Sequence, residues 1–122
     1  MNLKLVFRIF AGFGALSGLM GLAIPKAMAE GYGMAFNDDI HLVIQFLNMV
    51  QLMMAIIVWK LPDWLGDNLP KAGSTMMVIS LLPVAMNIYH VVTGALPASG
   101  VQIGESVIWI VFAGLFYTYS KK

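Results

Sequence analysis

Four apolar runs, each about as long as a membrane is thick, take up most of the chain. They cover residues 5–24, 40–61, 72–96 and 103–119. A helix that crosses a bilayer needs about 20 mostly apolar residues, and its backbone hydrogen bonds must be satisfied inside the membrane. Little of the chain is left for a water-soluble domain. The runs therefore predict one all-α domain, residues 1–122, of four membrane-spanning helices.

The composition agrees with lipid as the solvent. Of the 122 residues, 60% are hydrophobic and 11% are charged, and the mean hydropathy is +0.84. Soluble domains are roughly 45–50% apolar and about 25% charged, and so short a chain could not bury this much apolar surface in one core. The net charge of +1 gives no indication of a nucleic-acid partner. The absence of cysteine excludes disulfides, thiolate metal sites and cysteine redox chemistry.

Proline marks the expected end of the first three helices. Pro25, Pro62 and Pro97 each follow directly on an apolar run, and proline cannot continue a helix without the loss of a backbone hydrogen bond. The loops between the runs are short, so consecutive helices should be antiparallel. The sequence thus predicts an integral membrane four-helix antiparallel bundle with an up-down-up-down arrangement.

Lysine and arginine are distributed unevenly between the two sides of such a bundle. Lys26 alone lies on one side. The other side holds the remaining six basic residues: Lys4, Arg8, Lys60, Lys71, Lys121 and Lys122. Basic residues collect in the cytoplasmic loops of membrane proteins. We therefore expect both termini in the cytoplasm, and a bacterial inner membrane as the location.

The segment AIPKAMAEGYG, residues 23–33, permits two interpretations. Ala27, Met28 and Ala29 have the small-x-small form of a signal-peptidase site and follow a basic N-terminus and an apolar run, so the preceding residues could be a leader that is removed. Alternatively, Pro25 and the glycines end a first span that stays. The apolar run of about 20 residues exceeds the 7–15 residues of a signal sequence, which favours the retained helix.

Small residues form one face of the first predicted helix. Ala11, Gly14, Gly18 and Gly21 follow one another at intervals of three or four residues. Such a face lets another backbone approach closely, which is how membrane helices associate. We expect it to pack against another helix of the same chain, with dimerisation as the alternative.

Polar residues within the runs gather toward the extracytoplasmic end. The fourth run begins with Gln102, Glu105 and Ser106. At a rise of about 1.5 Å per residue, the polar side chains span roughly the outer 12 Å of the membrane. Polar groups inside a span are expensive unless they have partners. The pattern predicts a polar cavity that is open to the outside, whose candidate residues are His41, Gln45, Asn48, Asn87, His90 and Glu105.

Several roles remain open for these residues. Hydrogen bonds among the amides and His90 could simply hold the second and third helices together. The two histidines with Glu105 could bind a divalent metal, but His41 and His90 differ in depth by about one helical turn, so no metal site is predicted. A Glu–His pair could carry a proton. A small amphipathic ligand, such as a quinone or a lipid, could occupy a pocket lined by amides and imidazoles.

The whole chain resembles the small DoxX-like four-helix membrane proteins and the families grouped near them. A glycine-dotted first helix ends in AIPKAMAEGYG, and the third apolar run closes with NIYHVVTGALP. The likeness covers nearly the whole chain and consists mostly of Gly and Pro at helix ends. It implies the four-helix fold. Some DoxX proteins are associated with thiosulfate:quinone oxidoreduction, but this chain has no catalytic motif to which that activity could be assigned.

Known motifs of catalysis and transport are missing. The sequence has no phosphate loop, nucleophile elbow or HExxH motif, and its first apolar run lacks the acid on which small multidrug-resistance transporters depend. We therefore expect no enzyme, no catalytic residue and no bound cofactor. The expected function is that of an accessory or small-amphiphile-binding subunit, beside a larger membrane complex or in a homo-oligomer. The alternative is a stand-alone transporter or carrier that uses the same cavity.

Overall fold

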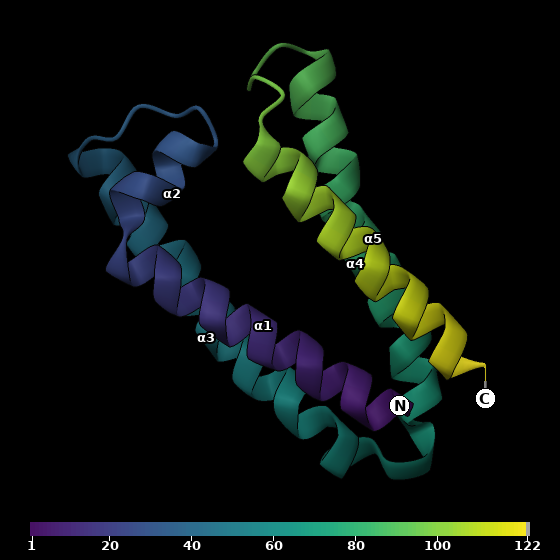
Figure 1. The fold of residues 1–122 in the computed structure, drawn as a ribbon. Coiled ribbons are helices and arrows are strands. Elements are labelled where there is room, and N and C mark those ends of the chain that lie inside the picture. Colours follow the sequence, from purple (N-terminus) through teal and green to yellow (C-terminus); the bar gives the residue numbers. More distant parts are fainter. Residues whose placement is uncertain (122) are drawn as a thin grey trace.

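The computed structural model describes residues 1–121 and is all-α, as the sequence predicts (Figure 1). Four helices are long, and a short one, α2, lies where the sequence predicts a loop. Proline is favoured in the first turn of a helix, and Pro25 begins α2. The elements are α1 (Leu3–Ala23), α2 (Pro25–Gly31), α3 (Asp38–Leu65), the 3-10 turn η1 (Gly66–Asn68), α4 (Leu69–Val92) and α5 (Gly100–Ser120).

Within residues 1–121, three helical stretches are long and apolar enough to cross a membrane. They are Leu3–Ala23, Asp38–Val92 and Gly100–Ser120, and the second runs through α3, η1 and α4. Many of their large apolar side chains lie on the surface, and Phe46 and Ile56 are each 66% exposed. Soluble monomers rarely expose contiguous apolar surface on this scale. These are the features of a small membrane protein that contacts lipid.

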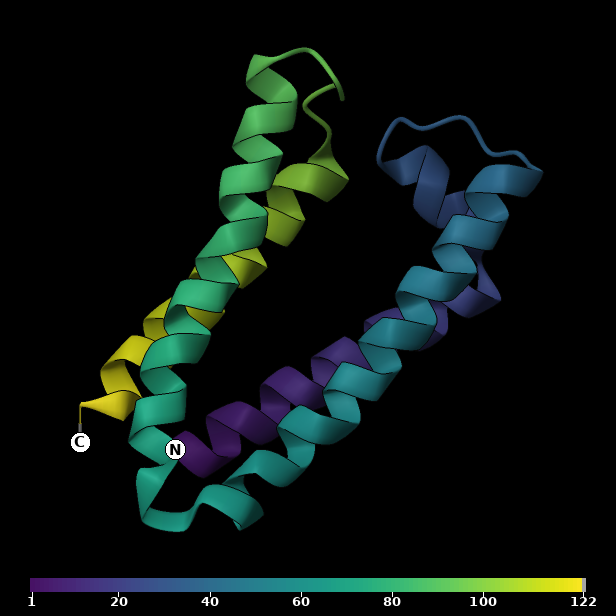
Figure 2. The same ribbon diagram turned by 180° about the vertical axis from the view of Figure 1, so that it is seen from behind.

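The long helices form two pairs and not one closed bundle. α1 packs along α3 and α4 packs along α5, whereas α3 and α4 make few contacts with each other. The pairs share one end, where the N-terminus, η1 and the C-terminal end of α5 lie, and they diverge from it (Figures 1 and 2). The expectation that all consecutive helices are neighbours is therefore wrong for α3 and α4. Lipid tails are as apolar as the helix surfaces, so no hydrophobic force draws the two pairs together.

The small-residue face of α1 lies against α3. Ala11 is 2% exposed. A Cβ atom on Gly18 would lie 3.1 Å from the Leu52 side chain, and a Cβ atom on Gly21 would overlap the side-chain amide of Asn48. A side chain at either position would crowd these α3 side chains, so the close contact of the two helices depends on glycine there. The face thus serves packing within the chain.

An aromatic cluster joins the two pairs near their common end. The Phe7 and Phe116 rings, both fully buried, meet edge-on at 5.1 Å between centroids. The Phe10 ring lies 5.0 Å from Phe112, 5.4 Å from Phe116 and 5.6 Å from Trp109. Aromatic pairs contribute about 0.5–1.5 kcal/mol each beyond the burial of their area. Side chains, more than close backbone contact, therefore hold α1 to α5.

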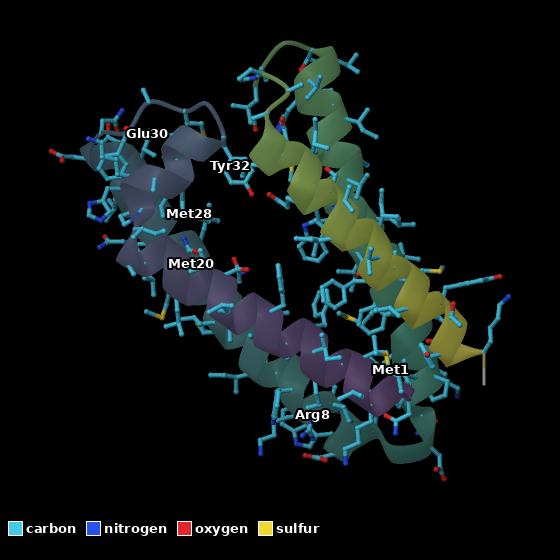
Figure 3. The ribbon with its side chains drawn as sticks, viewed as in Figure 1. Met1, Arg8, Met20, Met28, Glu30 and Tyr32 are labelled. Atoms are coloured by element: carbon cyan, nitrogen blue, oxygen red, sulfur yellow. The ribbon has the colours of Figure 1, made fainter. Side chains whose placement is uncertain are left out.

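A second contact between the pairs lies at the opposite end. A Cβ atom on Gly31, at the end of α2, would lie 3.2 Å from the Val101 side chain of α5. Gly33 has φ +78° and lies against Pro97. Tyr32, between the two glycines, projects toward α5 (Figure 3). The α2 segment thus reaches across to the start of α5.

α3 continues past the proline at which we expected it to end. Pro62 lies inside the helix, which ends at Leu65. The additional turn carries Asp63, whose carboxylate accepts a hydrogen bond from Arg8 of α1 at 3.1 Å. The Arg8 guanidinium also lies 4.6 Å from the ring centroid of Trp59. These contacts with α1 stabilise the last turn in spite of the backbone hydrogen bond that Pro62 cannot make.

α4 ends earlier than the sequence predicts. The helix stops at Val92 and not at Leu96, because Gly94 adopts φ +77°, a conformation that favours glycine. The Leu96 N–H then donates to the carbonyl of His90 at 3.2 Å, which closes the helix end. Pro97 follows this cap and does not itself stop the helix.

Alanine at Gly21 is expected to lower the free energy of unfolding by about 1–3 kcal/mol, the usual effect of overpacking. Its methyl group would displace the Asn48 amide, which donates to the carbonyl of Ile44 at 2.7 Å. Gly12 is the matched control, because nothing lies near its Cβ position. Alanine there should be neutral or stabilise by up to about 1 kcal/mol through helix propensity. Equal stability of the two variants in detergent unfolding would contradict the close approach of α1 and α3.

Candidate functional site

The polar residues predicted to form one layer lie instead in the two separate helix pairs. The Asn48 amide donates to the Ile44 carbonyl of its own helix, α3, at 2.7 Å. The Asn87 amide of α4 donates to the hydroxyl of Ser106 of α5 at 3.0 Å. Asn48 and Asn87 therefore do not form hydrogen bonds between α3 and α4. The cause is the pairing of the helices, since α3 packs on α1 and α4 on α5.

The polar groups of α3 serve its packing on α1. The Gln51 amide donates to the carbonyl of Gly14 at 3.0 Å, which the absence of a side chain on Gly14 leaves within reach. Gln45 is exposed on the surface of α3. His41 lies in the first turn of α3, with its ring 5.4 Å from the ring of Phe36. The structure does not bring these side chains to the polar groups of α4 and α5.

A groove between α4 and α5 is lined in part by three polar residues of the second pair. Its volume is about 380 Å³, within the range of roughly 300–1,000 Å³ that small-molecule sites occupy. Most of its lining is apolar, and Asn87, Gln102 and Ser106 are the polar residues among it. The hydrogen bond from Asn87 to Ser106 links its two helices. Apolar residues along it include Val84, Ile88, Val91, Ile103 and Val107.

Gln102 is the residue that distinguishes this groove. Its side chain is only 3% exposed, and neither its amide nitrogen nor its amide oxygen has a hydrogen-bond partner. Its backbone N–H donates to the Ser99 hydroxyl, which caps α5. A buried polar group without a partner costs about 1–3 kcal/mol. Native structures seldom retain such a group without a reason, of which an absent water, ion or ligand is a common one.

Sequence reasoning noted Gln102 as polar but left it out of the candidate residues. Its spacing of four residues from Ser106 places both on one face of α5, and this was the available signal. That spacing could not reveal that Ser106 is already bonded to Asn87 while Gln102 has no partner. Whether a polar side chain finds a hydrogen-bond partner depends on the residues packed around it in the fold. A pattern of residue types along the sequence does not show those neighbours.

Glu105 lies three residues after Gln102 and has an unfilled acceptor, but it is not among the residues that line the groove. Its Oε1 accepts a hydrogen bond from the indole of Trp109 at 3.2 Å, whereas its Oε2 is buried without a partner. Residues three apart are neighbours on a helix surface. Both ion pairs within residues 1–121 involve Asp63, at the other end of the molecule. Glu105 thus has no basic side chain beside it in the described part of the chain.

His90 does not join this group. It is half-buried on α4, with its ring 6.1 Å from that of Tyr89, and it is not part of the groove lining. Across residues 1–121, no three His, Asp or Glu side chains are placed to hold a metal ion together.

A second groove, of about 370 Å³, lies at the end that carries the N-terminus. Asn2, Asp67 and Tyr119 border it. None of its lining residues belongs to the described residues with buried, unpartnered side-chain atoms. The α4–α5 groove is therefore the stronger candidate for a site.

Comparisons of the chain with protein-family models, with curated proteins and with solved structures find no match. The resemblance to DoxX-like proteins gains no support from them. The site has to be interpreted from its own chemistry. That chemistry is the Gln102 amide with a free donor and a free acceptor, together with the bonded Asn87 and Ser106 side chains, in a mostly apolar groove. Such a site can bind a molecule with a polar head and an apolar chain.

Replacement of Gln102 by methionine, which has a similar shape, is expected to raise the melting temperature of the ligand-free protein. The change removes an unpartnered buried amide, which costs about 1–3 kcal/mol. Ser106→Ala should instead lower the stability by about 0.6 kcal/mol, the average for a hydrogen bond between membrane helices. Thermal unfolding in detergent micelles compares the two. A lower melting temperature for Gln102→Met would mean that the amide already has a partner.

Proposed function

We propose that the protein is an integral membrane subunit that binds a small amphipathic molecule in the groove between α4 and α5. The apolar chain of this molecule lies along the groove, and its polar head bonds to Gln102. The observation that carries the proposal is the buried Gln102 amide with no partner on either atom. A ligand head that both donates and accepts a hydrogen bond would satisfy it.

The proposed topology has four crossings with both termini in the cytoplasm. The end that holds η1 and the termini also carries five of the described basic residues, whereas Lys26 lies in α2 at the opposite end (Figure 1). The excess of basic residues supports that end as the cytoplasmic one. In this orientation Gln102, in the first turn of α5, lies in the extracytoplasmic half. Ligand then enters from the outer leaflet or from outside the cell.

The chain is well suited to a test of this topology, because it contains no cysteine. Single cysteines at Ala35 and Ala98, in the loops that follow α2 and α4, should react with a membrane-impermeant maleimide in intact cells. A cysteine at Asn68 of η1 should react only after the membrane is made permeable. The reverse pattern would contradict the orientation. An intact mass that lacks residues 1–29 would contradict the retained first helix.

The binding test uses the purified protein in phosphatidylcholine nanodiscs and a panel of C12 amphiphiles, with dodecane as the ligand without a head group. The wild-type protein should bind at least one amphiphile and not dodecane. Gln102→Met should weaken that binding about tenfold or more, which corresponds to about 1.4 kcal/mol. Gln45→Met is the matched control, since Gln45 is exposed on the other helix pair.

Equal binding to wild-type and Gln102→Met proteins would contradict the site. The same panel in proteoliposomes separates a binding subunit from a carrier. A binding subunit retains the amphiphile without moving it across the bilayer, whereas protein-dependent flux that Gln102→Met abolishes would indicate a carrier.

A further inference from the structure

We propose that the outer edge of the α1–α3 pair, at the end shared with α4 and α5, binds the phosphate group of phosphatidylglycerol through Lys4, Arg8 and Lys60. This site is separate from the α4–α5 groove and goes beyond the proposed function. Three observations carry it: an excess of positive charge around one acid, the open donors of Arg8, and apolar surface that is free to receive an acyl chain.

The first observation is the excess of positive charge. The Asp63 carboxylate of α3 lies 3.1 Å from the Arg8 guanidinium and 3.7 Å from the Lys4 ammonium group, both of α1. Lys60 lies three residues before Asp63, which makes the two neighbours on the surface of α3. Both ion pairs within residues 1–121 belong to Asp63, so Lys60 has no acidic partner in the described chain. One carboxylate thus lies among three cations, and a phosphodiester would supply a second negative charge.

The second observation is the state of the Arg8 guanidinium. It carries five N–H donors, of which Nη2 donates to Asp63, and it makes no other hydrogen bond within residues 1–121. The Trp59 ring centroid lies 4.6 Å from the guanidinium carbon and supports the group from one side. The Arg8 side chain is 21% exposed, so a ligand can reach part of it. Arginine binds phosphate oxygens well in such a setting, because its planar fork can donate two hydrogen bonds at once.

The charged edge faces away from the second helix pair. Arg8 projects from α1 on the side away from α5 (Figure 3). Phe10 contacts the α5 rings, and Arg8, two residues earlier, lies about 200° from it around the helix. Lys4 is one turn before Arg8 and therefore on the same face. The site thus opens toward lipid and not toward the space between the pairs.

The third observation is the apolar surface next to these charges. Gly12 lies one turn after Arg8 on the same face of α1, and no atom lies within 4 Å of the position that a Cβ atom would take there. On α3, Ile56 lies one turn before Lys60 and is 66% exposed. An acyl chain that begins at the phosphate can therefore lie against Gly12 and Ile56 toward the middle of the membrane.

The depth of the charges agrees with that of a lipid head group. Lys4 is the second residue of α1, and Lys60 lies in the last two turns of α3, so the cations lie at one end of both helices. The proposed topology assigns this end to the cytoplasmic leaflet, whose anionic lipids attract basic residues beside membrane helices. Phosphatidylcholine should bind less well there, because its head carries a cation next to the phosphate.

The test measures how lipids with dibrominated acyl chains quench a single tryptophan that they contact. The sequence has three tryptophans, Trp59, Trp64 and Trp109. One protein keeps only Trp59 and its control keeps only Trp64, with phenylalanine at the other two positions. Trp64 lies near the same end of α3 but about 140° away around the helix. In mixed bilayers we expect phosphatidylglycerol to be favoured over phosphatidylcholine about tenfold at Trp59 and about twofold or less at Trp64.

Variants of the protein that keeps Trp59 separate the site from a general attraction of the basic end. Arg8→Gln should abolish the preference for phosphatidylglycerol. Lys60→Gln should reduce it severalfold without harm to the fold, because this exposed side chain has no ion pair to lose. Lys71→Gln removes the same charge from the start of α4 and should change nothing.

Equal quenching of Trp59 by the two lipids would overturn the proposal. So would a preference of the same size at Trp64, or one that Lys60→Gln leaves unchanged. None of these results bears on the α4–α5 groove, whose binding test uses other variants.

Discussion

Packing of α1 against α5 through aromatic rings, and against α4 through Leu3, holds together two helix pairs that make few other contacts. Within the α1–α3 pair, small residues of α1 make room for α3, as Gly21 does for the Asn48 side chain. Between the pairs, rings such as Phe7 and Phe116 bridge a wider separation, with 5.1 Å between their centroids. In lipid, apolar surface alone does not drive helices together. The relative position of the pairs therefore depends on this cluster, on Leu3 against Gly73 of α4, and on the contact between Gly31 and Val101 at the far end.

The division into pairs also decides where polar chemistry can occur. In the α1–α3 pair, Gln51 bonds to the Gly14 carbonyl and Asn48 to the Ile44 carbonyl. In the α4–α5 pair, Asn87 and Ser106 satisfy each other, while Gln102 and Glu105 keep unfilled hydrogen-bonding atoms. A polar group inside a membrane lowers stability unless it has a hydrogen-bond partner. A bound ligand is one explanation for a group that keeps no partner within the chain.

The sequence predicted those parts of the fold that depend on local pattern. Apolar length defined the long helices, and the spacing of the glycines identified the face of α1 that packs. What it could not predict depends on contacts between segments distant in the chain. α3 passes Pro62, and Asp63 in its last turn binds Arg8 of α1. Hydropathy does not show that α3 packs on α1. That the Gln102 amide has no hydrogen-bond partner can be seen only in the packed structure.

The state of the Gln102 amide is the most direct point to measure. The chain has three glutamines, Gln45, Gln51 and Gln102, so a protein labelled with ¹⁵N-glutamine gives three side-chain NH₂ signals in nanodiscs. We expect a C12 amphiphile that binds to shift the Gln102 signals toward values typical of hydrogen-bonded amides and to leave those of Gln51, which already donates to Gly14, unchanged. Gln102 signals that look hydrogen-bonded without ligand, and that do not respond to any amphiphile, would contradict a binding site in this groove.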